Sequence, residues 1–240
     1  MKKKYHIGCS GYYYSYWKNR FYPEGMAPKN WLTYYSTVFN TVELNGTFYR
    51  TPKLFALKRY AEATPKDFKF AVKMSKYITH ITRLKDSKQN IKDFQELLQE
   101  GLGKKLNHYL FQLPPSYHYT EENLEKIIRN IPHKPENVVE LRHTSWWNKE
   151  VEKAFKKAKL TFCNVDFPGL KTYFIHTSDH FYLRLHGNPE LFKSSYTDAE
   201  LKKLKKEFPK DCKEQSIYFN NTYYEAGYKN AQALQKLIKK

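Results

Sequence analysis

The chain has 240 residues and a formal net charge of +18. It has no run of about 18 apolar residues and no apolar signal region, which excludes a transmembrane helix and a secretory signal. Its three cysteines are widely spaced, which excludes a disulfide framework and a cysteine metal motif. We therefore expect one cytoplasmic domain over residues 1–240, with no membrane partner.

Eight short runs rich in β-branched and aromatic residues predict strands, and helical patterns lie between most of them. The strand runs cover residues 5–11, 39–45, 68–74, 107–113, 137–142, 160–166, 180–186 and 215–221. The helical patterns cover residues 28–39, 52–64, 87–103, 120–131, 147–160, 197–208 and 223–240, whereas residues 169–178 are irregular. Repeated strand–helix units predict an α/β fold, a single (β/α)8 TIM-type barrel.

Alternation along the strands predicts which residues face the barrel axis, because successive side chains of a strand point to opposite faces. In each run, one register places the apolar residues against the helices and the polar residues toward the axis. For the sixth run, this register points Asn164 and Asp166 inward, and Cys163 and Val165 outward. The polar ends of all the strands then meet in one place.

Functional residues of such barrels lie at the C-terminal ends of the strands, so these polar ends predict a pocket. Candidates for catalysis, as groups that move protons, are Glu43, Lys73, Glu140, Asp166 and His186. Candidates for binding a substrate are Ser10, Tyr12, Trp17, Asn45, Tyr49, His80, Gln112, Arg142, His143, Arg184 and Asn220.

The three carboxylates, Glu43, Glu140 and Asp166, have more than one interpretation. They form an acid–base set, or they ligate a metal, or they only balance the charge of cations on neighbouring strands. A divalent metal is not favoured, because Lys73 and two arginines would repel it. We therefore assign no metal ligands and leave the cofactor open.

The cations and aromatic residues of the rim suggest what enters the pocket. The planar forks of Arg142 and Arg184 suit phosphate or carboxylate groups. Rim aromatics such as Tyr12, Trp17 and Tyr49 either stack on bases and sugars or pack the end of the barrel. The net charge of +18 attracts polyanions, although codon bias toward lysine is another explanation for it.

Longer motifs make the chain similar to the family called domain of unknown function 72, or YecE-like. They are, in chain order, IGCSGYYYSYWKNRFYPEGM, FNTVELNGTFYRTP, TPKDFKFAVKMSKYITH, FQLPPSY, VVELRHTSWW, VDFP, YLRLHG and FNNTYYEAGYKNAQAL. The family's Glu-x-Arg-His pattern is present as Glu140, Arg142 and His143, while Tyr12 stands where the family usually has Trp. The resemblance implies a (β/α)8 barrel and supplies no reaction.

Two functions follow from these observations. The first is an enzyme, a hydrolase or lyase with carboxylate or histidine acid–base chemistry, acting on an anionic substrate such as a nucleic-acid fragment or sugar phosphate. The alternative is a non-catalytic nucleic-acid-binding protein that uses its basic surface and rim aromatics. The sequence leaves the substrate and the oligomeric state open.

Overall fold

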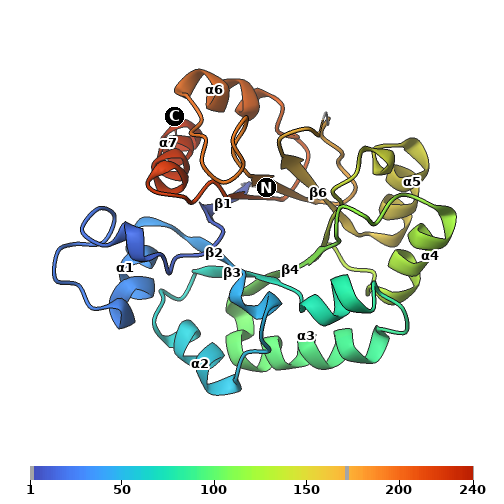
Figure 1. The fold of residues 1–240 in the computed structure, drawn as a ribbon, viewed down its shortest axis with the longest axis horizontal. Helices are drawn as coiled ribbons and strands as arrows, with labels where there is room; N and C mark the ends of the chain where they lie inside the picture. The colour runs from blue at the N-terminus through green and yellow to red at the C-terminus, as the bar shows by residue number, and fades with distance from the viewer. Residues whose placement is uncertain (1–2, 171–172, 240) are drawn as a thin grey trace.

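A parallel eight-stranded sheet forms the centre of the computed structural model, which describes residues 3–170 and 173–239. Its spatial order is β1-β8-β7-β6-β5-β4-β3-β2, and the strands form a ring with the helices outside it (Figure 1). The strands are β1 Lys4–Cys9, β2 Thr41–Leu44, β3 Lys69–Lys73, β4 Leu106–Gln112, β5 Asn137–Glu140, β6 Thr161–Asp166, β7 His180–Leu185 and β8 Glu214–Phe219. The predicted (β/α)8 TIM-type barrel is confirmed.

A helix follows every strand of the described chain except β6. The helices are α1 Trp31–Val38, α2 Leu54–Glu62, α3 Lys88–Leu102, α4 Glu121–Asn130, α5 Lys149–Ala158, α6 Asp198–Lys206 and α7 Ala226–Lys239. The predicted irregular stretch, residues 169–178, is irregular wherever it is described; residues 171–172 lie outside the described part. Within the described ranges, no helix is long and apolar enough to cross a membrane.

The seam between β1 and β2 closes the ring, and it depends on a glycine. A β-carbon on Gly8 would lie 2.2 Å from the carbonyl oxygen of Thr41, so only glycine allows the two strands to approach this closely. The Tyr35 hydroxyl accepts a hydrogen bond from the Cys9 amide at 2.7 Å and donates to the Thr41 carbonyl at 3.1 Å. One buried phenol therefore links the strands where their ladder is incomplete.

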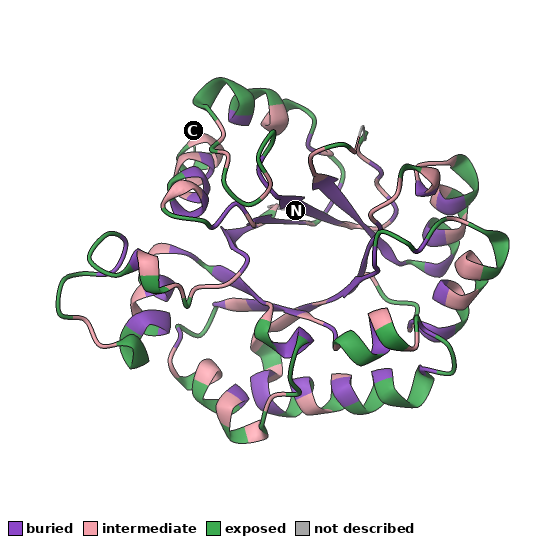
Figure 2. Cartoon of the chain, viewed as in Figure 1, coloured by how far each residue is buried: buried purple, intermediate pink, exposed green. Residues whose placement is uncertain are grey.

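The strands bury both of their faces, as Figure 2 shows. Their outer faces pack against the helices in the large core, and a small apolar cluster fills the barrel interior. We call it the inner layer; it consists of Ala71, Leu110, Val138, Cys163, Val165, Tyr182 and Tyr218. For the other strands, the inner and outer residues agree with the predicted alternation.

The predicted register of β6 is wrong. Cys163 and Val165 belong to the inner layer, and Asn164 points to the outside. Since no helix covers β6, the irregular segment does so and uses polar contacts. Asn164 accepts a hydrogen bond from the Ile175 amide at 2.8 Å and donates to the Ile175 carbonyl at 3.0 Å. The polar residue of β6 thus anchors a loop, and alternation alone does not distinguish this from an inward position.

Candidate functional site

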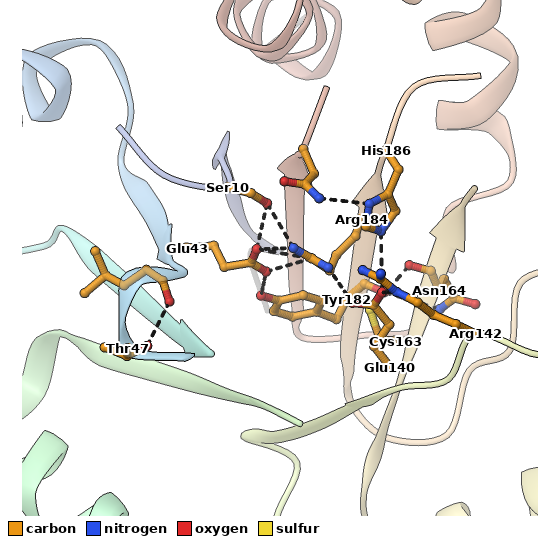
Figure 3. A network of polar contacts seen from close by, with 12 residues as sticks. Ser10, Glu43, Thr47, Glu140, Arg142, Cys163, Asn164, Tyr182, Arg184 and His186 are labelled. Atoms are coloured by element: carbon orange, nitrogen blue, oxygen red, sulfur yellow. Dashed lines mark hydrogen bonds and ion pairs between the residues drawn. The ribbon is translucent and has the colours of Figure 1, made fainter. Parts of the chain in front are cut away.

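A buried arginine between two glutamates forms the centre of the C-terminal rim (Figure 3). Arg184, at the end of β7, is 1% exposed. Its Nη2 lies 2.7 Å from Glu43 Oε1, its Nε lies 3.1 Å from both Glu43 oxygens, and its Nη1 lies 2.5 Å from Glu140 Oε2. Every nitrogen of the guanidinium is therefore engaged by a carboxylate, which leaves Arg184 no free edge for a ligand.

The Glu43 carboxylate is held by further donors. Ser10 Oγ donates to its Oε1 and the Tyr182 hydroxyl donates to its Oε2, each at 2.6 Å. Burial raises the pKa of Tyr182 well above its usual value, and the negative charge of Glu43 adds to this rise, so the phenol stays protonated. Glu43 is itself fully buried. It serves as the buried counter-ion of Arg184 and does not reach the solvent.

Glu140, at the end of β5, is the second counter-ion. Its Oε1 accepts a hydrogen bond from Arg142 Nε at 2.6 Å, and its Oε2 faces Arg184. Burial alone would raise the pKa of Glu140, but Arg142 and Arg184 hold it well below its usual range. Glu140 is consequently a permanent anion near neutral pH.

His186 lies behind Glu140 as a buried neutral imidazole. Asn220 Nδ2 donates to its Nδ1 at 2.9 Å, which assigns the ring hydrogen to Nε2, 3.5 Å from Glu140 Oε1. Burial lowers the pKa of His186 to about 4, even though Glu140 opposes this shift. His186 and Asn220 therefore lie beside the glutamate, as predicted, but His186 Nε2 has no hydrogen-bond partner within the described residues.

Lys73, at the end of β3, is the cation that the carboxylates leave unpaired. Its Nζ lies 4.0 Å from the ring centre of Phe48, a cation–π contact. Across the described residues, no carboxylate lies within ion-pair distance of this ammonium group. Burial lowers the pKa of Lys73 to about 8, and the charge of Arg184 contributes to this shift. Lys73 is thus poised to exchange a proton near neutral pH.

Arg142 and His80 lie close to this lysine. Only the Nε of Arg142 is hydrogen-bonded within residues 3–170 and 173–239, so its terminal nitrogens remain available, and the side chain is 15% exposed. Burial lowers the pKa of His80 to about 4, and Lys73 and Arg142 are the largest charges that add to this shift. The His80 ring packs edge-on against Phe48, 4.8 Å away. Lys73 and His80 therefore share one aromatic neighbour.

Asp166 does not join this network, although the sequence placed it there. Its carboxylate accepts hydrogen bonds from the Tyr196 hydroxyl at 2.7 Å and from Asn188 Nδ2 at 3.1 Å. In the described chain, no contact joins it to Glu43 or Lys73. The reversed register of β6 explains this, because the side chains of Asn164 and Asp166 share its outer face.

Trp17 is a core residue and cannot touch a substrate. It is 0% exposed, and its indole donates a hydrogen bond to the Tyr224 carbonyl at 2.7 Å. It packs on Phe21, Tyr22 and Tyr228. The sequence allowed two interpretations of this tryptophan, stacking on a ligand or packing the end of the barrel. The structure supports packing.

Tyr12, Asn45 and Tyr49 lie together along a groove beside the network. Their groove has a volume of about 840 Å³ and includes Arg50 and Lys53. Asn45 Oδ1 is buried without a hydrogen-bond partner among the described residues, and Tyr49 is 81% exposed. The loops that form this groove follow β1 and β2, whose ends carry Ser10 and Glu43 into the network. We call it the rim groove.

The remaining candidates have local partners. Gln112 is buried, and its Nε2 donates to the Leu113 carbonyl at 2.7 Å. His143 Nδ1 lies 2.8 Å from Ser145 Oγ, and its ring stacks on that of His118 with centres 3.9 Å apart. These contacts orient the side chains without directing them at Lys73.

Sequence reasoning missed two residues that shape the site. Tyr182 points inward two positions before Arg184, so the same alternation could have identified it as a partner of Glu43. Phe167, whose ring centre lies 5.2 Å from the Arg142 guanidinium, gave no such signal because it follows β6 in an irregular loop. Within the described residues, the one grouping with metal-ligand geometry lies elsewhere in the barrel, at His108, His180 and Glu214.

Comparisons with known proteins agree with this fold. A model of the DUF72 family, described as a protein of unknown function, matches residues 6–240. The solved DUF72 family protein TM1631 from Thermotoga maritima MSB8 is 30% identical, with a TM-score of 0.89 over 99% of this chain and 100% of that chain. The DUF72 family protein EF0366 from Enterococcus faecalis V583 is 21% identical, with a TM-score of 0.81 over 100% and 99%, which supports the fold alone.

A curated relative is matched over a shorter stretch. The UPF0759 protein YecE of Escherichia coli strain K12 is 29% identical over 119 residues. These cover 49% of this chain and 43% of YecE, so the match spans less than half the length of that relative. None of these names states a substrate or a reaction.

Proposed function

The chain belongs to the DUF72 family, and we propose that it is an enzyme that acts on an anionic, phosphate-bearing substrate at the C-terminal rim of its barrel. The observation that carries the proposal is the state of Lys73, a rim ammonium with no carboxylate partner in the described chain and a pKa lowered to about 8. Perturbed ionisable groups without a structural partner are typical of functional sites.

The charges of the rim favour an anion. Glu43 and Glu140 supply two negative charges, against which stand Arg142, Arg184 and Lys73. One positive charge is therefore in excess when Lys73 is protonated. Because Arg184 is saturated, the donors left for a ligand are the terminal nitrogens of Arg142 and the Lys73 ammonium. A fork and a compact charge side by side suit a phosphate group.

The same residues supply acid–base chemistry. A lysine with a pKa of about 8 is present in both protonation states near neutral pH, so it donates a proton to a leaving group or removes one from a substrate. His80, neutral because its pKa is lowered to about 4, is the nearby acceptor. The buried Glu43 and Glu140 hold the cations in place and do not transfer protons. A hydrolase or lyase reaction fits this division of roles.

The rim groove suits the rest of the substrate. Tyr12 and Tyr49 offer aromatic faces, and Asn45 lines the groove beside them. Aromatic faces beside cations bind sugars and bases. A sugar phosphate or a nucleic-acid fragment, with its phosphate at Lys73 and Arg142, is the substrate class that we propose.

Non-catalytic nucleic-acid binding is the second candidate, and the net charge of +18 favours it. The two functions differ in their response to salt. Binding of a polyanion along a surface weakens steeply as salt rises, with a slope set by the number of phosphates contacted. A pocket for one phosphate gives a shallow slope. The unpaired Lys73 favours the enzyme, because a surface binder does not require a buried, deprotonatable cation.

Inorganic phosphate tests the pocket. Thermal unfolding is measured with and without phosphate for the wild type, the double variant Lys73→Met/Arg142→Met, and Lys92→Met, an exposed control. We expect phosphate to stabilise the wild type and the control by RT ln(1 + [L]/Kd), about 2.7 kcal/mol at 100 Kd. The double variant should gain only the general stabilisation that phosphate, as a salt excluded from protein surfaces, gives to any folded protein. Equal stabilisation of all three proteins would contradict an anion pocket.

A further inference from the structure

The opposite, N-terminal end of the barrel holds a second polar cluster, which we call the base cluster. It consists of His6 on β1, His108 on β4, and His180 and Glu214 at the starts of β7 and β8. The inner layer lies between it and the rim. His108 is fully buried, and the Glu214 side chain is 12% exposed. None of these residues takes part in the proposed function.

The ligand atoms of the base cluster have the spacing of a coordination shell. His108 Nε2 lies 3.1 Å from His180 Nδ1 and 3.7 Å from Glu214 Oε1, and His6 Nε2 lies 3.6 Å from the same oxygen. Bonds of about 2.0–2.1 Å around a tetrahedral Zn²⁺ place neighbouring ligand atoms about 3.3 Å apart. The spacings that join His108 to His180 and to Glu214 lie on both sides of that value, so small side-chain movements would bring these three ligands to one ion.

An unsatisfied histidine points to the missing ligand. His6 is 7% exposed, and neither of its ring nitrogens has a hydrogen-bond partner within residues 3–170 and 173–239. Burying a polar atom without a partner costs about 1–3 kcal/mol, so such groups call for an explanation. A cation between His6 and Glu214 would satisfy Nε2 by accepting its lone pair.

The charge of the base cluster is also compatible with a cation. Among the described residues, no lysine or arginine forms an ion pair with Glu214; its charged or chargeable neighbours are His6 and His108. This contrasts with the rim, where cations surround each glutamate. A divalent ion would meet one carboxylate and neutral imidazoles, with no repelling ammonium or guanidinium group.

We propose that the base cluster is a binding site for a first-row divalent cation, with Zn²⁺ as the best fit. His108 Nε2, His180 Nδ1 and Glu214 Oε1 supply three ligands that lie within 4.8 Å of one another. His6 Nε2, 3.6 Å from Glu214 Oε1, would supply the fourth after turning toward the other two histidines. A closed set of four protein ligands is typical of a structural site. Such a site would tie four strands together across the base of the barrel.

Cobalt binding tests the site, because tetrahedral Co²⁺ absorbs visible light. Chelator-treated full-length protein is titrated with Co²⁺ alone, and we expect one equivalent to bind with an intense tetrahedral spectrum that Zn²⁺ then abolishes. The variants His180→Gln and Glu214→Gln should bind more than about tenfold more weakly, since even changes outside the ligand set weaken binding by that factor. His133→Gln, at an exposed histidine, and His186→Gln, at the rim, should bind like the wild type.

Folding of each variant is checked by circular dichroism, and His180, at the edge of the cluster, is the substitution least disruptive to the core. If the wild type binds no Co²⁺, or if His180→Gln and Glu214→Gln bind it as tightly as the wild type, the proposal is overturned. Loss of binding in His186→Gln with retention in Glu214→Gln would also overturn it, since the metal would then occupy the rim.

Discussion

The two ends of the barrel solve the burial of polar groups in opposite ways. At the rim, arginines saturate two glutamates, and a lysine remains without a carboxylate partner in the described chain. At the base, three histidines surround one glutamate, and the ring nitrogens of His6 remain unsatisfied among the described residues. The rim therefore has one more cation than carboxylates, whereas the base has imidazole nitrogens without a hydrogen-bond donor in the part of the chain that the structure describes. We therefore propose that one end binds an anion and the other a cation.

The inner layer separates the two ends and also connects them. The Tyr182 hydroxyl reaches up to Glu43, and its ring packs edge-on against His108, with centres 5.2 Å apart. The apolar layer separates the cations of the rim from the base cluster. The two proposed sites therefore do not compete for the same side chains.

Removing the central arginine should have the largest effect on stability. Arg184→Met leaves Glu43 and Glu140 buried with fewer partners, and breaking a buried ion pair in this way costs about 3–5 kcal/mol. Urea unfolding measures the loss. The matched control is Arg20→Met, whose exposed ion pair with Glu225 is worth about 0–1 kcal/mol. Equal losses of unfolding free energy in Arg184→Met and Arg20→Met would contradict the account, because the ion pairs of the rim would then be no stronger than an exposed pair.

Removing the unpaired lysine should stabilise the fold below pH 8. The pKa of Lys73 is about 8 in the folded protein and 10.5 in the unfolded chain, so the unfolded chain binds more protons between these values. The contribution of Lys73 to the stability of the wild type should therefore rise from pH 8 to pH 10.5, by no more than about 3 kcal/mol. Lys73→Met should be more stable at pH 7 and lose this advantage near pH 10.5. A constant difference across this pH range would contradict the buried-cation interpretation.

The link through the inner layer should contribute least. Tyr182→Phe removes a hydrogen bond to a carboxylate, which is worth about 1.5–3 kcal/mol. Tyr218→Phe is the matched control, because the neighbouring phenol bonds the neutral hydroxyl of Thr41 and is worth about 0.5–1.5 kcal/mol. Calorimetric unfolding compares them. A larger loss of stability for Tyr218→Phe than for Tyr182→Phe would contradict the claim that the hydrogen bond to Glu43 is the stronger of the two.

Much of the rim could be predicted from the sequence, because strand ends and alternation are local patterns. Glu43, Glu140 and Arg184 converge as expected, since their strands are regular and each has a helix on its outer side. The prediction for Asp166 was wrong because β6 lacks such a helix, and the polar residues of β6 form hydrogen bonds with the covering loops instead. Periodicity does not reveal which side of a strand a loop will occupy.

The division of roles inside the network could not be predicted either. Alternation places Arg184 and Lys73 on the same side but does not show that two glutamates saturate the arginine and leave the lysine unpaired. That outcome depends on which strands lie opposite each other across the barrel. The base cluster escaped notice for a related reason, since His108, His180 and Glu214 come together only when the ring closes.

The titration of Lys73 tests the central claim most directly. Lysines are labelled by reductive ¹³C-methylation, the Lys73 resonance is assigned by its absence in Lys73→Arg, and its chemical shift is followed against pH with and without inorganic phosphate. The account predicts a midpoint near 8 without phosphate, because burial disfavours the ammonium, and a higher midpoint with phosphate, because a bound anion favours it. A midpoint near 10.5 that phosphate does not move would contradict the claim that Lys73 is an unpaired cation in an anion site.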